Sequence, residues 1–310
     1  MSVSALNTEE QLESLWSLGG LTLRELARRV WGGINQTDLL NRAYELAYTF
    51  LLAVFPFLLF LVALFGTLVS EKSPFRNSLL NYIQPALPPA AYHLLAGTFQ
   101  EVTHNTGRGK ITFGLLFLLF SGSGGMTQLI STLNAAYEVH EGRSWIKIHL
   151  VSLGLTLATS VLIIIAVLLA LVGDHFLRSA GLAVGLNAFA AVATKILHWM
   201  IAIGSVVLAF ATTYYFAPDV KEQHWYWITP GSVVGVALWA IASIGLRVYL
   251  HFFNSYSRIY GSLGAVIILL LWFYITGLAI LIGGEVNATI EHAAAEQGHP
   301  EAKPAGRKAA

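Results

Sequence analysis

Residues 47–69 read AYTFLLAVFPFLLFLVALFGTLV and contain no charged side chain. A helix needs about 20 mostly apolar residues to cross the roughly 30 Å hydrocarbon core of a bilayer. In lipid, only helices and closed barrels satisfy every backbone polar group. Residues 151–172 and 228–246 are equally free of charge. These three stretches therefore predict transmembrane α-helices.

Three further apolar stretches complete the pattern, at residues 111–133, 186–216 and 261–284. Six such stretches predict an all-α integral membrane protein whose six transmembrane helices form one bundle. We expect residues 41–292 to make up this domain, after an N-terminal segment of residues 1–40. Residues 293–310 are rich in Ala, Gly, Pro and Lys, and this composition predicts a disordered tail.

The composition also indicates a membrane protein. Hydrophobic residues make up 55% of the 310-residue chain and charged residues only 11%, against about 25% in soluble domains. A net charge of +1 removes the usual electrostatic basis for nucleic-acid binding. The absence of cysteine excludes disulfides and thiolate metal sites. We therefore expect membrane lipids, and no nucleic acid, among the binding partners.

The distribution of Lys and Arg predicts the orientation, because these residues favour the cytoplasmic side of a membrane. If both termini are cytoplasmic, ten of the 18 Lys and Arg residues lie on that side and seven on the other, with Lys195 inside a span. The sequence thus predicts cytoplasmic N and C termini, so that the N-terminal segment and the tail share one side.

Two segments outside the spans are predicted to contain surface helices. Residues 21–34 place apolar residues on one helical face and three arginines on the other, as an amphipathic helix does. Such a helix can lie among lipid headgroups or pack on the cytoplasmic end of the bundle, and the sequence leaves both open. Residues 70–110 contain four prolines among apolar residues and predict short interfacial helices in the first outer loop.

Ionisable and polar side chains near a membrane boundary are candidates for function, because charges inside lipid are costly. Arg42, Glu45 and Tyr48 share one helical face at the start of the first span. Four further residues are expected at the same depth: Asn134, Tyr137, Arg143 and Glu285. Together these residues predict either a polar vestibule open to the cytoplasm or a set of contacts that join helix ends in the headgroup region.

Lys195 and Arg247 are the basic residues expected elsewhere in the membrane. Lys195 lies toward the membrane centre if the fourth span begins near residue 186, and reaches the outer interface if the span begins near residue 194. His198 follows Lys195 by three positions, on the same predicted face. Arg247 ends the fifth span on the outer side, where its side chain can extend to the interface.

Two spans contain residues that interrupt a helix. Pro56 removes one helical hydrogen bond inside the first span. Residues 121–126 read SGSGGM and place Gly122, Gly124 and Gly125 near the middle of the second span. Such glycines either permit very close helix packing or unwind the backbone, as happens at transporter binding sites. Both interpretations stay open at this point.

Enzyme signatures are missing from the sequence. The ten histidines show no His-x-His or His-Glu-x-x-His spacing of a metal site. Neither a phosphate-binding loop nor a Gly-x-Ser-x-Gly nucleophile motif occurs. We therefore predict a protein that is not an enzyme and that needs no cofactor and no metal.

Several short motifs, taken together, resemble one known family. They are YELAYTF at residues 44–50, SGSGGM at 121–126, LNAAY at 133–137, TPG at 229–231, YGSLG at 260–264 and GGEVN at 283–287. In this order they are similar to the motifs of the YihY/virulence factor BrkB family, over roughly residues 25–292. The resemblance implies a six-span protein of the bacterial inner membrane. It also implies an old ribonuclease label, which the lack of metal ligands, of a basic patch and of a soluble domain does not support.

Members of this family are associated with envelope integrity and lipid export, and so the resemblance implies a transport role. We predict an envelope transport protein that moves an amphiphilic or anionic substrate, such as a phospholipid, across or between leaflets. Arg42 and Arg143 would attract a phosphate headgroup, and Lys195 would pass it toward Arg247. Glutamates 45 and 285 would hold the arginines in place or couple transport to protons.

Two other classes of function remain open. A scaffold of an envelope complex would move nothing and would keep a stable partner. A small-solute or ion transporter would have a narrow aqueous path in place of a groove that faces lipid. A homo-oligomer is compatible with all three functions.

Overall fold

The computed structural model describes residues 16–68, 116–117, 119–184, 188–220, 228–252 and 262–297. Within these residues the chain is entirely helical, without a β-strand. Among the described residues a 3-10 turn, η1 (Leu18–Gly20), precedes seven α-helices with described bounds, and residues 119–122 belong to a further helix. The seven are α2 (Leu23–Gln36), α3 (Leu39–Leu68), α7 (Gly124–Ala136), α8 (Trp145–Val184), α9 (Ala188–Phe216), α10 (Pro230–Phe252) and α12 (Ser262–Glu296).

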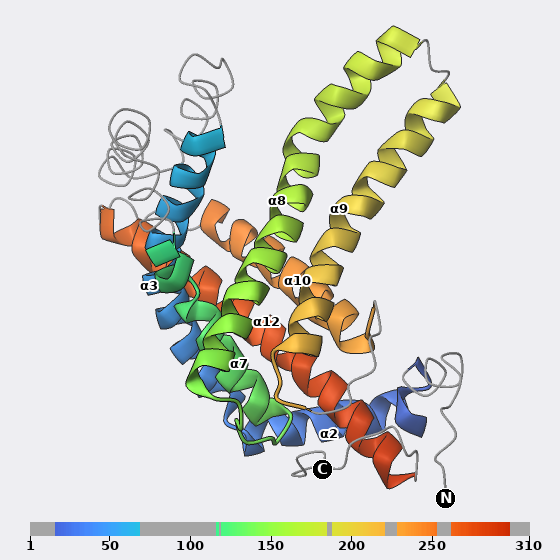
Figure 1. Cartoon of the computed structure of the whole chain (residues 1–310). Coiled ribbons are helices and arrows are strands. Elements are labelled where there is room, and N and C mark those ends of the chain that lie inside the picture. The colour runs from blue at the N-terminus through green and yellow to red at the C-terminus, as the bar shows by residue number, and fades with distance from the viewer. Residues whose placement is uncertain are drawn as a thin grey trace, which may run out of the picture.

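Six of these helices, from α3 to α12, alternate in direction (Figure 1). Helix α2 lies across one end of them, where α3, α8 and α10 begin and where α7, α9 and α12 end. We call this the polar end; it comprises α2, the loop of residues 137–144, residues 217–220 and the last turns of α12. Helices α8 and α9 pack along each other and extend far beyond the opposite end of α7 (Figure 1).

Four helices are long and apolar enough to span a membrane, as judged on the described side chains: Trp145–Ala166, Lys195–Phe216, Pro230–Phe252 and Val266–Glu296. They correspond to the third to sixth predicted spans. Helix α3 covers the first predicted span and has 30 residues, which at 1.5 Å per residue give about 45 Å. Helix α7 covers the end of the second. The complete six-span bundle stays a prediction.

The last helix is longer than its predicted span. Helix α12 continues twelve residues beyond residue 284, and Ala293 and Ala294 are buried. The predicted tail therefore begins too early, because residues 293–296 continue the helix. Their packing against η1 explains the extension: the Gln297 side chain donates a hydrogen bond of 2.8 Å to the carbonyl of Gly19. Residues 298–310, like the predicted interfacial helices of residues 70–110, lie outside the described residues.

Helix α2 occupies most of the predicted range of residues 21–34. The Thr22 hydroxyl accepts a hydrogen bond from the Glu25 amide and caps the helix N-terminus. Residues at a spacing of four, Leu26, Val30 and Ile34, form its buried face, which packs against α12 and α3. These contacts support the interpretation that α2 packs on the bundle. A second role among lipid headgroups stays a prediction.

Candidate functional site at the polar end

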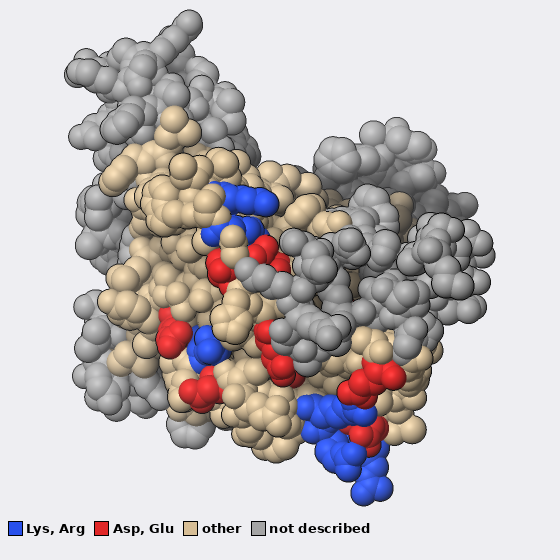
Figure 2. All heavy atoms as spheres, turned by 60° about the horizontal axis from the view of Figure 1, so that its bottom comes forward, with Lys and Arg blue, Asp and Glu red and all other residues tan. Residues whose placement is uncertain are grey.

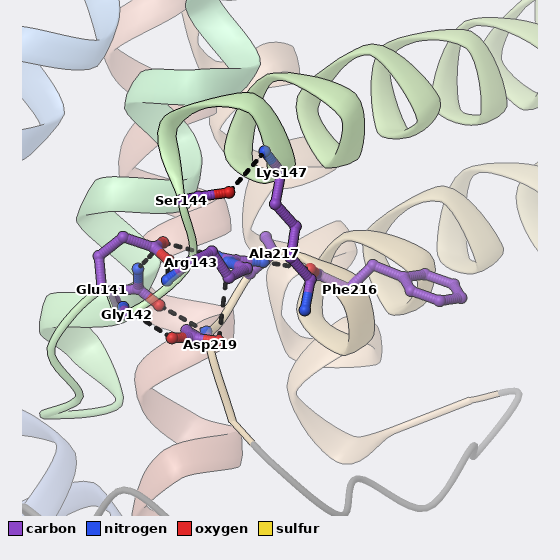
Figure 3. Close-up of polar contacts among 9 residues, drawn as sticks. Glu141, Gly142, Arg143, Ser144, Lys147, Phe216, Ala217 and Asp219 are labelled. Atoms are coloured by element: carbon purple, nitrogen blue, oxygen red, sulfur yellow. Dashed lines mark hydrogen bonds and ion pairs between the residues drawn. The ribbon is translucent and has the colours of Figure 1, made fainter.

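Charged side chains of both signs gather on the face of the molecule that contains the polar end (Figure 2). Arg143 makes the densest set of contacts there, and only 7% of its side chain is exposed. Its Nε and Nη2 atoms donate to the two carboxylate oxygens of Glu141 at 2.8 and 2.7 Å. Its Nη1 and Nη2 atoms also donate to the carbonyls of Phe216 and Ala217 at 3.3 and 2.7 Å. Figure 3 shows this arrangement.

Two further residues close the cluster around Arg143. Asn134 donates to Glu141 at 2.8 Å and accepts from the Asp219 amide at 2.7 Å. Asp219 lies 3.7 Å from the Arg143 Nε atom and accepts from the Gly142 amide at 2.8 Å. Burial raises the pKa of Glu141, but hydrogen bonds from Arg143 and Asn134 outweigh it and hold that pKa below its ordinary value. The cluster therefore joins the α7–α8 loop to the end of α9.

Glu285 lies in a different environment, packed against the backbone of α2. Its side chain is buried, with 6% exposed, and its Oε2 atom has no hydrogen-bond partner among the described residues. A Cβ atom on Gly33 of α2 would overlap its Oε1 atom, so the helix backbone lies directly on this carboxyl group. Tyr137 is buried nearby, and burial raises the pKa of its hydroxyl well above the ordinary value. No described Lys or Arg makes an ion pair with Glu285.

The TPG and GGEVN motifs meet in space, although more than 50 residues separate them. Asn287 accepts from the Gly231 amide at 2.8 Å and donates to the Thr229 hydroxyl at 3.0 Å. A Cβ atom on Gly283 would lie 2.6 Å from the Gly231 carbonyl oxygen and would overlap the Tyr214 hydroxyl. The Tyr214 hydroxyl donates a hydrogen bond of 2.7 Å to the backbone carbonyl of Ile280 in α12. Helices α9, α10 and α12 thus meet without space for a side chain.

The predicted face of α3 points mostly outward. Arg42 is half-buried and donates to the Thr37 carbonyl at 2.8 Å. Glu45 is exposed, and its carboxylate accepts from Gln128 of α7 at 3.1 Å. Tyr48 is 61% exposed. The structure therefore does not bring Arg42, Glu45 and Glu285 into contact, and the described ion pairs do not include them.

The interrupted helices pack closely against each other. A Cβ atom on Gly122 would lie 2.9 Å from the Cβ of Phe57, next to Pro56, and one on Gly125 would lie 2.8 Å from the ring of Phe50. Gly124 faces open space. Helix α3 continues through Pro56, whereas the helix of residues 119–122 is interrupted by a turn at residue 123 before α7 begins. These contacts favour the close-packing interpretation for residues 122 and 125.

The Ser123 carbonyl accepts a hydrogen bond from the Thr127 amide at 3.0 Å, as in a regular helix. The Ser152 hydroxyl of α8 donates to this carbonyl at 2.9 Å, and Thr127 contacts the same hydroxyl at 2.9 Å. The hydroxyl from the neighbouring helix therefore adds a second hydrogen bond to this carbonyl and joins α8 to the start of α7.

Lys195 and Arg247 are exposed on the outer surface of the helices. Lys195 borders an open groove of about 570 Å³ whose other lining residues are Ile196, Trp199, Met200, Ile203 and Gly204. Arg247 borders a second open groove, of about 530 Å³, with Val248, Leu250, His251 and Phe252. His198 is buried, with 6% exposed, and so it does not share the exposed face of Lys195 as its spacing predicts.

Sequence reasoning missed several residues of these contacts. Glu141, Asp219 and Tyr214 were not predicted. Asp219 and Tyr214 contact groups that lie 66 to 85 positions away in the sequence. The partners of Glu141, Asn134 and Arg143, lie nearby in the sequence. For Asn287 a signal existed, since it belongs to the GGEVN motif. Its partner at residues 229–231 belongs to another of the same family motifs, and two motifs of one family are natural candidates for a contact.

The apolar helices and the buried polar contacts at their common end define a multi-pass α-helical membrane protein. The chain belongs to the Virulence factor BrkB family, whose family model matches residues 30–307, and this confirms the resemblance seen in the sequence motifs.

The relatives carry two kinds of name. YfkH of Bacillus subtilis (strain 168), called ribonuclease-like, is 33% identical over 250 residues, or 81% of this chain and 89% of the relative. A UPF0761 membrane protein of Vibrio vulnificus (strain YJ016) is 28% identical over 254 residues, which cover 81% of this chain and 77% of the relative. A UPF0761 membrane protein of Rhodospirillum centenum is 27% identical over 252 residues, which cover 80% of this chain and 53% of the relative. No solved structure matches this chain.

Proposed function

We propose that the protein moves an amphiphilic substrate, a phospholipid, between the leaflets of the bacterial inner membrane, with six spans and cytoplasmic termini. The groove at Lys195 is the observation that carries this proposal. A single cation borders a surface that is otherwise apolar, with Ile196, Trp199 and Met200. A phosphate group beside the ammonium and an acyl chain along the apolar residues would match both parts of this surface.

The position of Lys195 along α9 supports the same proposal. It precedes Phe216, which contacts the Arg143 cluster, by about six helical turns, or about 32 Å along the helix. That length is close to the roughly 30 Å of the hydrocarbon core. If the Arg143 cluster lies at one membrane surface, Lys195 lies near the other. Such a lysine reaches headgroups by extending to the interface, rather than sitting at the membrane centre.

The contacts at the polar end change the roles of three residues in this proposal. The nitrogen atoms of Arg143 all contact Glu141, Asp219 or backbone carbonyls, so we assign Arg143 to holding helix ends together. Glu285 holds no described arginine. An unpaired charge is costly to bury, whereas a neutral carboxylic acid is much cheaper. We therefore propose that Glu285 takes part in proton coupling, and that Arg42, rather than Arg143, contacts an anionic headgroup.

The scaffold and small-solute functions are less well supported. The grooves at Lys195 and Arg247 open to the outside of the helices, which suits a lipid better than a hydrated ion. Ribonuclease chemistry, as the name of YfkH suggests, has no support among the described residues, where no three His, Asp or Glu side chains could hold a metal ion. We keep the proposal of a protein that is not an enzyme.

Lipid translocation in proteoliposomes tests the proposal. Wild type, Lys195→Ala and Arg28→Ala would be compared with labelled phospholipids; Arg28 is an exposed arginine of α2, away from either groove, and serves as the control. We expect slower translocation for Lys195→Ala and no change for Arg28→Ala. Equal rates for all three proteins would remove Lys195 from the path. No translocation of any lipid by well-folded protein would favour the scaffold.

A further inference from the structure

The outward face of α3 at the polar end combines an acid with aromatic rings. Ala43, Leu46 and Ala47 are buried against the bundle, whereas Glu45 and Tyr48 are exposed. Tyr44 is also exposed, and the face is bounded on both sides, by α7 and α12. It therefore forms an accessible strip between two neighbouring helices.

Two side chains of the strip, Tyr44 and Glu45, contact neighbouring helices. The Tyr44 ring stacks on the Tyr274 ring of α12, with ring centroids 4.4 Å apart and an interplanar angle of 13°. The Glu45 carboxylate accepts from Gln128 of α7 at 3.1 Å. Tyr48 follows Tyr44 by four positions and Glu45 by three, so its ring lies one turn above both. The three side chains thus lie on one exposed face, with Tyr44 on its α12 side and Glu45 on its α7 side.

The carboxylate of Glu45 makes no ion pair with a described Lys or Arg. Arg42 lies one turn before it but donates to the Thr37 carbonyl instead. The hydrogen bond from neutral Gln128 leaves the negative charge of Glu45 in place. An exposed carboxylate beside aromatic rings attracts a cation, because the faces of such rings also carry partial negative charge.

We propose that Glu45, Tyr44 and Tyr48 bind the ammonium group of a zwitterionic phospholipid headgroup. This inference rests on the proposed transport function and specifies its substrate class. Glu45 lies six residues after the start of α3, about 9 Å along the helix. Leu52, two turns beyond Glu45, is exposed and apolar, and an acyl chain of the same lipid would lie along it. An anionic lipid without an ammonium group would be repelled by Glu45.

Lipid binding to the purified protein tests this inference separately from transport. Binding of phosphatidylethanolamine and phosphatidylglycerol would be measured by native mass spectrometry for wild type, Glu45→Gln, Tyr48→Leu and Glu25→Gln. Glu25 is the control, because its carboxylate is paired with Arg28 at 2.7 Å on α2. We expect wild type and Glu25→Gln to prefer phosphatidylethanolamine, and Glu45→Gln to lose about five- to tenfold of that preference. Tyr48→Leu should lose a smaller part.

Equal preference in wild type and Glu45→Gln would overturn the headgroup site, and the tyrosines would then only mark the membrane interface. Binding that depends on Glu45, together with no translocation in proteoliposomes, would overturn the transport function but keep the site. Translocation at equal rates for both lipids and for Glu45→Gln would overturn the site but keep the transport function. The two proposals can therefore fail independently.

Discussion

Two adjacent glycines in α2 provide a test of how this helix packs on Glu285. A methyl group added at Gly33 would overlap the Glu285 carboxylate, whereas one added at Gly32 would meet nothing within 4 Å. Gly32→Ala and Gly33→Ala therefore make the same chemical change at neighbouring positions of one helix. Any difference between the two variants reports on the contact with Glu285.

The expected magnitudes follow from two opposing effects. Replacing Gly by Ala inside a helix stabilises it by about 0.8–1 kcal/mol. Forcing an extra methyl group into a closely packed contact costs about 1–3 kcal/mol. We expect Gly32→Ala to stabilise the docked α2 by about 1 kcal/mol. For Gly33→Ala we expect destabilisation of up to about 2 kcal/mol, since the buried Glu285 side chain has little space to move.

Hydrogen exchange of the α2 amides in lipid nanodiscs measures the free energy of opening this helix. Gly33→Ala should exchange about five- to 150-fold faster than Gly32→Ala, since the two differ by about 1–3 kcal/mol and about 1.4 kcal/mol corresponds to a factor of ten. The double variant Gly33→Ala/Glu285→Ala should recover protection, because removal of the carboxylate makes space for the methyl group. Equal protection in Gly32→Ala and Gly33→Ala would refute the packing of α2 on Glu285.

Three further predictions concern other contacts. Arg143→Gln should lower the free energy of unfolding by about 2–4 kcal/mol in detergent, less than a fully buried pair would lose because Glu141 is partly exposed. Since the folded-state pKa of Glu141 is lowered, its contribution to stability is present above the ordinary pKa near 4.3 and is lost as the pH falls below that value. Acidification should therefore lower the melting temperature of the wild type more than that of Arg143→Gln. An equal decrease in both proteins would contradict this pairing. Gly283→Ala should lower the thermal midpoint in detergent, since its methyl group would overlap the Tyr214 hydroxyl, whereas Gly204→Ala faces open space; equal midpoints would argue against the close approach of α9 and α12. A spin label at Trp31→Cys, made simple by the absence of other cysteines, should be more accessible to oxygen than to a water-soluble relaxation agent if α2 lies on lipid, and the reverse would place it in water.

The apolar pattern predicts the helices well, because burial in lipid and the length of a span leave few alternatives. It does not predict where α12 ends, since residues 293–296 are held by contacts with η1 that no local pattern encodes. The sequence also places Arg143 correctly near a helix end. It cannot tell whether that arginine is free to bind a headgroup, because two of its acceptors are backbone carbonyls at the end of α9, more than 70 residues away.

The exposed strip on α3 shows the same limit. Spacing predicts that Arg42, Glu45 and Tyr48 share a face, and Glu45 and Tyr48 are indeed both exposed. Spacing alone cannot show that Gln128 and Tyr274 border this face, since helix–helix neighbours are a property of the packed bundle. Similarly, Lys195 and His198 are three positions apart, yet one is exposed and the other is buried. Residues three positions apart in a helix point in directions about 60° apart. At the edge of a helix–helix contact this angle is enough to bury one side chain and expose the other.

The packing of α2 on α12 has a consequence for biosynthesis. Much of the surface that receives the buried face of α2 belongs to α12, and Glu296 of α12 pairs with Arg29 across 267 positions. At about 5–20 residues per second, a ribosome needs roughly 13–50 s to synthesise that helix after α2 has emerged. During this interval Leu26, Val30 and Ile34 lack their contacts with α12 and have only those with α3. Helix α2 therefore completes its packing late, and an amphipathic helix in that state can bind the surface of a membrane.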